Sequence, residues 1–239
     1  MRTIAVLLLG FLLTGWLEAG QVQGKVTLSA ELEGARKARR KDQDRLLQRA
    51  GYERSEVDSD REGPAAFKRD EEAANVVVFL VGQGLPVGSP GTVILNQKDR
   101  RFVPHVLPVM AGATVQFPND DRIFHHVYST DPSFDFPKYP PTAAAPSKVP
   151  RRTVSLRSGE VPTVIELFCG IHSRMNAYLV VLPNRCFTRA DAQGNYQIAG
   201  VPAGSYTLCA WHPRANPRMI KAPVTVPASG SVEANLSWK

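Results

Sequence analysis

The chain has 239 residues, of which 43% are hydrophobic and 21% charged, and its formal net charge is +7 at pH 7. These proportions are those of a globular protein and argue against a wholly disordered or membrane-embedded chain. The length suits one or two domains, and we favour two. A basic protein can bind nucleic acid, but no basic patch interleaved with aromatic residues occurs, so an acidic protein partner or an anionic surface fits better.

Residues 1–20 have the features of a secretory signal peptide. A short basic start is followed by an almost continuous apolar run at 4–16, and Ala19 and Gly20 are small enough for a cleavage site. The run is shorter than the roughly 20 residues that span a bilayer, and no second run follows, which argues against a membrane anchor. The sequence therefore predicts a periplasmic or secreted protein with no membrane span after signal removal.

Residues 34–73 form the most charged segment. Between Arg36 and Glu72 there are eleven Lys or Arg and ten Asp or Glu, with few large apolar residues. Mixed charge of this density is typical of a solvated face or a partly disordered segment. We therefore expect a charged helical or disordered insertion near the N-terminus.

From Asn75 onward, short apolar or alternating runs are separated by Gly, Pro, Asn and Asp, which is the pattern of a β-sandwich or barrel. The expected strands are residues 76–81, 92–96, 102–109, 114–117, 123–129, 152–156, 163–169 and 177–182. The third is confined to a sheet edge or a bulge, because Pro104 and Pro108 cannot donate ladder hydrogen bonds. A Pro-rich segment, 131–150, connects the fifth and sixth strands as a surface loop.

The sharpest local signal is the loop Cys169-Gly170-Ile171-His172-Ser173-Arg174-Met175. It places a thiolate, an imidazole and a thioether three residues apart, and together they form a soft, partly apolar site suited to copper. Each residue alone has an ordinary interpretation, since a buried Cys packs as a small hydrophobe and Met fills cores. One more nitrogen ligand, from a neighbouring strand, would complete the site.

The expected strand 123–129 offers two histidines, of which one can point inward. Because side chains alternate across a strand, His125 lies on its aliphatic face and His126 on its aromatic face. The same alternation puts Cys169 on the inner face of its own strand, so His125 and Cys169 can converge. The choice of His125 over His126 nevertheless stays open.

The predicted metal ligands are His125, Cys169, His172 and Met175. Two imidazoles and one thiolate, with a methionine sulfur as a weak axial ligand, describe a blue-copper electron-transfer centre. Such a site leaves no open position for a substrate, unlike a catalytic metal site.

The segment 92–182 resembles the cupredoxins, the plastocyanin and amicyanin group. The Cys-x2-His-x2-Met loop has the short spacing of amicyanin, and residues 112–120 followed by His125 are similar to the family's strand and first copper histidine. This resemblance implies a Greek-key β-barrel, one type 1 copper ion and electron transfer through the edge of His172.

The chain departs from this family at two positions of the expected site. His126 stands where relatives usually carry Asn after the first histidine ligand, and that Asn takes part in hydrogen bonds that steady the ligand loop. Arg174 stands within the ligand loop, where a relative can be apolar. From this departure we expect a more basic docking rim in this chain than in its relatives.

Residues 183–239 form a second all-β module, which resembles the carboxypeptidase regulatory-like fold, a small β-sandwich without catalytic groups. Residues 24–28 and 75–80 resemble parts of the same fold, so strands from 21–91 are expected to join this sandwich, with the copper domain inserted. The whole arrangement resembles bacterial exported proteins labelled methylamine-utilisation or plastocyanin-like. Cys186 and Cys209 lie in this module, and both a disulfide and two free thiols remain possible.

The remaining polar candidates have ordinary roles. We expect His105 and His212 to be surface or satisfied strand histidines, because both lie far from the ligand loop in sequence. Asp120 and Asp121 follow a Pro-Asn pair and are expected to form a turn rather than to act as acids.

The leading hypothesis is an exported type 1 copper protein that is not an enzyme and that carries single electrons between redox partners, such as a dehydrogenase, a cytochrome or an oxidase. One alternative is a copper-binding or delivery protein with an exchangeable ion. A second is a cell-surface binding module with an incidental metal site. A hydrolase is disfavoured because no nucleophile has a base partner at a recognisable spacing.

Overall fold

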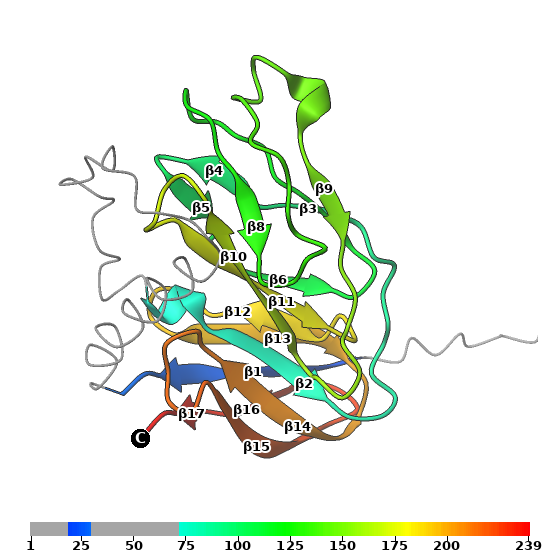
Figure 1. Cartoon of the computed structure of the whole chain (residues 1–239). Coiled ribbons are helices and arrows are strands. Elements are labelled where there is room, and N and C mark those ends of the chain that lie inside the picture. Colours follow the sequence, from blue (N-terminus) through cyan, green and yellow to red (C-terminus); the bar gives the residue numbers. More distant parts are fainter. Residues whose placement is uncertain (1–18, 30–71) are drawn as a thin grey trace, which may run out of the picture.

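The computed structural model describes residues 19–29 and 72–239 (Figure 1). The expected signal peptide at 1–20 and the expected charged insertion at 34–73 lie almost entirely outside the described residues. Within the described part, the chain is all β, which confirms the predicted fold class. Its helices there are two short 3-10 turns, η2 (Ala73–Asn75) and η3 (Pro146–Lys148). Neither is long and apolar enough to cross a membrane.

The first unit is a β-sandwich that combines strands from both ends of the chain. Its strands are β1 (Gly20–Thr27), β2 (Val77–Val81), β12 (Phe187–Arg189), β13 (Asn195–Val201), β14 (Gly204–Trp211), β15 (Met219–Val226), β16 (Ser231–Glu233) and β17 (Leu236–Ser237). One sheet has the order β13-β1-β16, with β17 also paired to β1, and the other has the order β12-β2-β14-β15. Most neighbours are antiparallel, but β1 runs parallel to β16 and β17.

The sandwich core lies between these two sheets. Residues of β1 and β2 are buried there beside residues of the C-terminal strands, and the core includes Val22, Val26, Val78, Leu80, Ile198 and Leu208. Burial alternates along β13, as expected for a strand with one face on the core and one in water. The start and the end of the described chain therefore depend on each other for burial.

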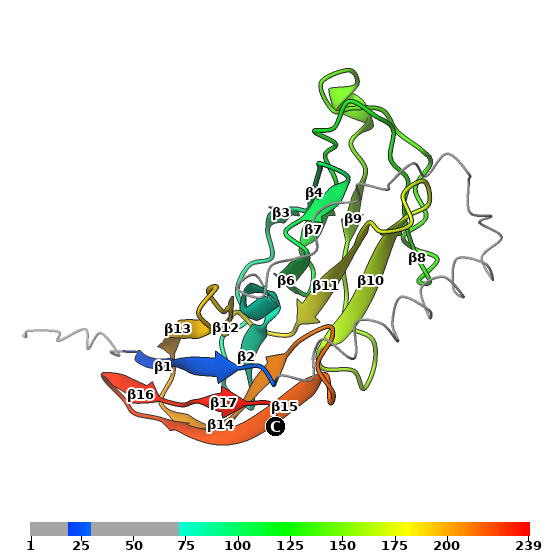
Figure 2. The same cartoon turned by 90° about the vertical axis from the view of Figure 1, so that its left-hand side faces the viewer.

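The second unit stands on this sandwich and is built from the middle of the chain. Its strands are β3 (Thr92–Ile94), β4 (Asn96–Lys98), β5 (Arg101–Val103), β6 (Val106–Met110), β7 (Thr114–Gln116), β8 (Val127–Ser129), β9 (Arg151–Thr153), β10 (Thr163–Cys169) and β11 (Asn176–Leu182). They form a sheet β6-β11-β10-β8, a sheet β3-β7-β9 and the hairpin β4-β5. Figure 2 shows the strands of this unit rising above the sandwich.

The core of the second unit packs against one face of the β6-β11-β10-β8 sheet. Along β10, Ile165, Leu167 and Cys169 all belong to this core, as the alternation in the sequence predicts. Phe117, which follows β7, and Val127 of β8 belong to the same core. Cys169 is thus the last inward-facing residue of β10 and lies at one end of the core.

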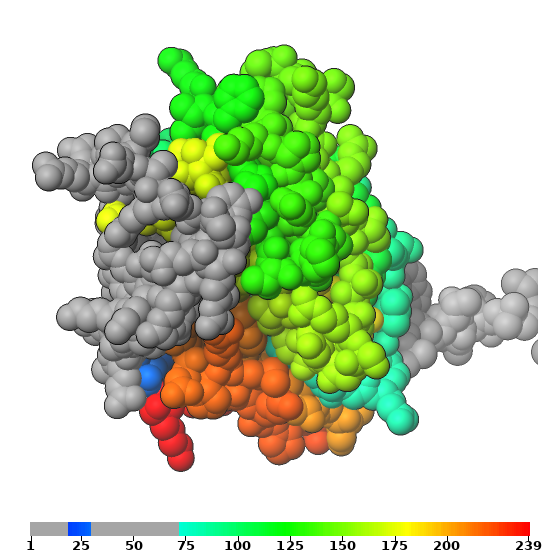
Figure 3. Space-filling view, in the orientation of Figure 1, coloured from blue at the N-terminus to red at the C-terminus, as the bar shows by residue number. Residues whose placement is uncertain are grey.

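A third apolar cluster joins the two units. It contains Val77 and Phe79 from β2, Tyr178, Val180 and Leu182 from β11, and Cys209 and Trp211 from β14. β11 is buried on both faces, because its alternate residues, such as Leu179, belong to the core of the second unit. Figure 3 shows the orange atoms of the C-terminal strands packed directly against the yellow-green atoms of the second unit.

Three expected strands differ from the structure. The expected strand 102–109 is divided into β5 and β6 around Pro104, and β6 lies at a sheet edge, as the prolines predict. The expected strand 92–96 is divided into β3 and β4. The expected strand 123–129 begins only at Val127, because residues 121–123 form bends rather than extended backbone.

Candidate metal centre

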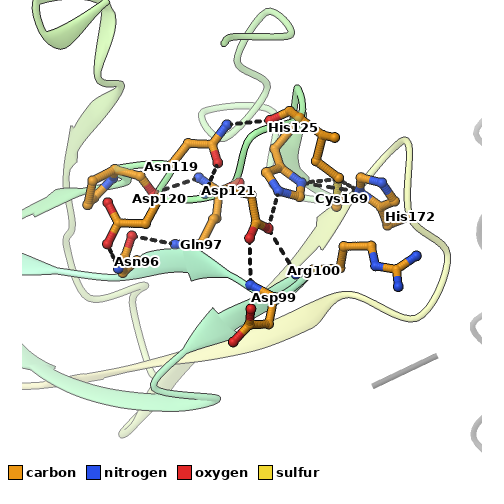
Figure 4. Close-up of polar contacts among 12 residues, drawn as sticks. Asn96, Gln97, Asp99, Arg100, Asn119, Asp120, Asp121, His125, Cys169 and His172 are labelled. Atoms are coloured by element: carbon orange, nitrogen blue, oxygen red, sulfur yellow. Dashed lines mark hydrogen bonds and ion pairs between the residues drawn. The ribbon is translucent and has the colours of Figure 1, made fainter. Parts of the chain in front are cut away.

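Three side chains from distant parts of the sequence converge at the end of β10. The Nδ1 atoms of His125 and His172 are 3.2 Å apart, and each is 3.5 Å from Sγ of Cys169 (Figure 4). These three residues form the one group of at least three His, Cys, Asp or Glu side chains within the described part of the chain that could hold a metal ion. His125 and Cys169 are buried, whereas His172 is partly exposed.

Pairing between β8 and β10 brings His125 to Cys169. Cys169 pairs with Val127, and the Gly170 N–H donates to the His126 carbonyl at 3.0 Å. His125 itself precedes β8 and forms an isolated β-bridge with Tyr139, in which each backbone N–H donates to the other's carbonyl. The Pro-rich segment that contains Tyr139 therefore fixes the backbone of the first histidine.

The loop after β10 folds back on itself and returns His172 to Cys169. The Met175 N–H donates to the His172 carbonyl, and the Cys169 N–H donates to the Met175 carbonyl, each at 3.0 Å. Met175 is only 1% exposed and belongs to the same core as Cys169. The Cys-x2-His-x2-Met loop is thus closed by two backbone hydrogen bonds, and the thioether of Met175 faces the interior.

The donor atoms fit a shared metal ion. Ligands held about 2.0–2.3 Å from one ion at roughly tetrahedral angles lie about 3.3–3.6 Å from each other. The observed separations of 3.2–3.5 Å fall close to this range. A thiolate and two imidazoles, with a buried thioether on the same loop, are the soft and borderline donors that favour copper over magnesium or calcium.

Burial sets the protonation of the two buried donors. It lowers the pKa of His125, although the hydrogen bond to Asp121 acts in the opposite direction. Burial raises the pKa of the Cys169 thiol, although backbone N–H groups of residues 126, 171 and 172 partly oppose this. A neutral His125 offers a lone pair to a metal directly, whereas Cys169 must release a proton when a metal binds.

The second candidate histidine points elsewhere. His126 is 7% exposed, its Nε2 lies 3.1 Å from Oδ1 of Asp135, and its ring stacks on Tyr128. Of the two adjacent histidines, the structure therefore brings His125 and not His126 to Cys169. Strand alternation predicts that His125 and Ile123 both face inward. His125 does, but Ile123 is 41% exposed.

The other candidates behave as follows. Nδ1 of His105 contacts the Asn176 carbonyl at 3.0 Å, and His212 is fully buried beside Glu72. Cys186 lies in the sandwich core and Cys209 in the cluster between the units, and both are free thiols. The structure therefore contains two separate thiols where a disulfide was one of the two expectations.

One residue of the site was missed from the sequence. Asp121, expected only as part of a turn, contacts Nε2 of His125 through Oδ2 at 2.8 Å. Its spacing of four residues before His125 is the one sequence signal for this contact, and it is weak because the segment between them is irregular. Asp120, its neighbour, instead accepts a hydrogen bond from Asn96.

No family model matches the sequence, and no curated protein matches it. Among solved structures, the amicyanin of Paracoccus versutus is 14% identical with a TM-score of 0.31, and the match covers 44% of this chain and 96% of amicyanin. A purple cupredoxin from Nitrosopumilus maritimus is 18% identical with a TM-score of 0.28, covering 38% of this chain and 98% of that one.

A copper-containing nitrite reductase from Thermus scotoductus is 22% identical with a TM-score of 0.31. That match covers 44% of this chain but only 26% of the reductase, so the chain spans about a quarter of that enzyme. The structural neighbours of this chain thus include cupredoxins, at low identity and over part of its length.

Proposed function

We propose that this protein is an exported type 1 copper protein, not an enzyme, that carries one electron at a time between redox partners. The observation that carries the proposal is the convergence of His125, Cys169 and His172 within 3.5 Å of one another at the end of a β-sheet. Met175 is the proposed weak axial ligand, because it is buried in the same core as Cys169.

The protein's role at such a site is to hold the donors in place. Copper bound there would supply a single-electron couple. Cys169 is held by strand pairing, His125 by its bridge to Tyr139 and His172 by the closed loop, so the three donors belong to backbone that is fixed by hydrogen bonds. Ligands that do not need to move between oxidation states favour fast electron exchange.

We propose that electrons enter and leave through His172. It is the one partly exposed member of the three, since His125 is 0% and Cys169 1% exposed. A redox partner docked over His172 would approach the site through one imidazole.

The residues beside the site indicate an acidic partner. Phe124 and Ile123, which precede His125, are 55% and 41% exposed. Arg122, next to them in the chain, and Arg174, two residues after His172, are exposed as well. Exposed apolar side chains flanked by arginines suit a transient partner with an apolar centre and a carboxylate rim. A dehydrogenase, a cytochrome or an oxidase with such a surface is the proposed class.

The electron-carrier proposal is tested by loading the purified protein with Cu(II). The expected product is intensely blue or green, bleaches with ascorbate and recovers its colour on reoxidation. The Cys169→Ser variant should give a pale product, because the colour arises from the copper-thiolate bond. A pale wild-type product, or rapid loss of copper to a mild chelator, would instead favour copper delivery or an incidental site.

We also propose that the sandwich is a carboxypeptidase regulatory-like unit into which the copper unit, residues 92–182, is inserted, with residues 183–239 returning to the sandwich. The pairing of β2 with β12 supports this, because the chain leaves and re-enters the sandwich on neighbouring strands. Amide hydrogen exchange tests it: β1 and β2 should open together with β13 and β14, whose core they share. Opening of β2 together with residues 92–182 would contradict it.

A further inference from the structure

The carboxylate of Asp121 is held on two sides. Its Oδ2 lies 2.8 Å from Nε2 of His125 and accepts a hydrogen bond from the Arg100 N–H at 2.9 Å, while its Oδ1 accepts one from the Asp99 N–H at 2.6 Å. Figure 4 shows the carboxylate between the histidine ring and the backbone at Asp99 and Arg100. Both oxygens therefore act as acceptors.

The two backbone donors come from a tight turn at the tip of the β4-β5 hairpin. Lys98 pairs with Arg101, so Asp99 and Arg100 are the two residues of the loop, and their φ angles are 54° and 55°. A two-residue hairpin with positive φ at both positions is a type I′ turn. Successive N–H groups in a turn form a concavity that binds anions, and here the Asp121 carboxylate occupies it.

Asp121 is also anchored through its own backbone. Its N–H donates to Oδ1 of Asn119 at 3.0 Å, and Nδ2 of Asn119 donates to the Ile123 carbonyl at 2.8 Å. Asn119 is 1% exposed, so these two hydrogen bonds of its side chain lie in the interior. The irregular segment between Asn119 and His125 is thus fixed by hydrogen bonds rather than by a regular strand.

These contacts determine which nitrogen of His125 carries the proton. An ionised carboxylate only accepts hydrogen bonds, so Nε2 of His125 must be the donor, and the lone pair of Nδ1 then faces Cys169 and His172. Both oxygens of Asp121 already accept a backbone N–H, from Asp99 and from Arg100, so the carboxylate acts as an acceptor toward His125 as well.

We propose that Asp121, clamped by the Asp99–Arg100 turn, is the positioning residue of the metal centre: it fixes the His125 tautomer with Nδ1 free for the metal and makes that imidazole a stronger ligand. The proposal rests on the proposed copper site. A negative charge behind the imidazole also favours the more positive oxidation state, and Asp121 should therefore lower the reduction potential.

The test compares Asp121→Asn with Asp120→Asn, which removes the same charge one residue away, where the carboxylate is exposed and bonds Asn96. In Asp121→Asn one of the two accepting oxygens is replaced by an amide NH2, which cannot accept a hydrogen bond from the turn or from His125. This variant should weaken Cu(II) affinity, measured by chelator competition, about 10–100-fold and raise the reduction potential. Asp120→Asn should leave both unchanged, and equal behaviour of the two variants would overturn the proposal.

A second measurement needs neither copper nor a variant. Long-range ¹H–¹⁵N NMR of the metal-free wild-type protein should find His125 protonated at Nε2 and not at Nδ1. The opposite tautomer would overturn the role of Asp121 even if copper binds. Conversely, the protein could show the expected tautomer but bind no copper through Cys169. That result would support the role of Asp121 in orienting His125 and would refute the proposed function instead. Thermal unfolding of both variants, followed by circular dichroism, separates loss of affinity from loss of fold.

Discussion

The Nδ1 atoms of His125 and His172 lie 3.2 Å apart, although 47 positions separate the two residues in the chain. Two lone pairs at this distance repel each other unless a proton or a cation lies between them. The fold nevertheless fixes both rings there, through the bridge from His125 to Tyr139 and through the hydrogen bonds that close the loop at Met175. This arrangement suits a cation held between the two nitrogens and Sγ of Cys169.

The two adjacent histidines should differ sharply on substitution. His125→Ala removes a donor of the three-residue group, so the intense copper colour should disappear and Cu(II) affinity should fall. His126→Ala removes only a ring that contacts Asp135 and Tyr128, so colour and affinity should be retained. Titration with Cu(II), followed by absorption, checks this. Retention of the colour in His125→Ala, with loss in His126→Ala, would reverse the ligand assignment.

The arginine in the ligand loop should control electron exchange with charged reagents. Arg174→Glu is expected to slow oxidation by anionic hexacyanoferrate and to accelerate oxidation by a cationic cobalt complex, with both effects shrinking as salt is added. Stopped-flow rates at several ionic strengths measure this. Arg185→Glu, an exposed change in the sandwich unit, is the matched control. Equal rate changes in the two variants would argue against docking near His172.

The folded protein should contain three free thiols. Cys186 and Cys209 belong to different apolar clusters, so their sulfurs do not face each other. Burial raises the pKa of Cys209 to about 11, which keeps it protonated and unreactive in the folded protein. Thiol titration after denaturation without reductant should count three groups per chain. A count of one would show that these two cysteines form a disulfide.

The cluster between the two units should contribute strongly to stability. Phe79 is 1% exposed and lies in this cluster, and its replacement by Ala should lower the free energy of unfolding by about 3–5 kcal/mol. Val87→Ala, at a position that is 75% exposed, should change it by less than about 0.5 kcal/mol. Chemical denaturation gives both values. A change of under about 1 kcal/mol in Phe79→Ala would mean that the units pack only loosely.

Much of the site was predictable because its pattern is local. The spacing of Cys169, His172 and Met175 lies within one loop, and the alternation along β10 places Cys169 inward. His125, rather than His126, lies beside Cys169, but the strand used to argue for His125 begins only at Val127. An irregular segment does not follow the alternation of a strand.

The role of Asp121 was not predictable, because its partners are not local. Its carboxylate is held by backbone N–H groups 21 and 22 residues earlier, and these point at it only once the β4-β5 hairpin has formed its turn. The turn residues Asp99 and Arg100 carry no glycine to mark positive φ. The separation of Cys186 from Cys209 was not predictable either. It depends on the packing of the sheets, which buries Cys186 in the sandwich core and Cys209 in the cluster between the units.

X-ray absorption at the copper edge tests the central claim most directly, because it identifies the atoms bonded to the ion. The copper-loaded wild-type protein should have one sulfur and two imidazole nitrogens as its close neighbours, and Cys169→Ser should lose the sulfur. A copper environment of oxygen and nitrogen alone, unchanged by Cys169→Ser, would contradict the account.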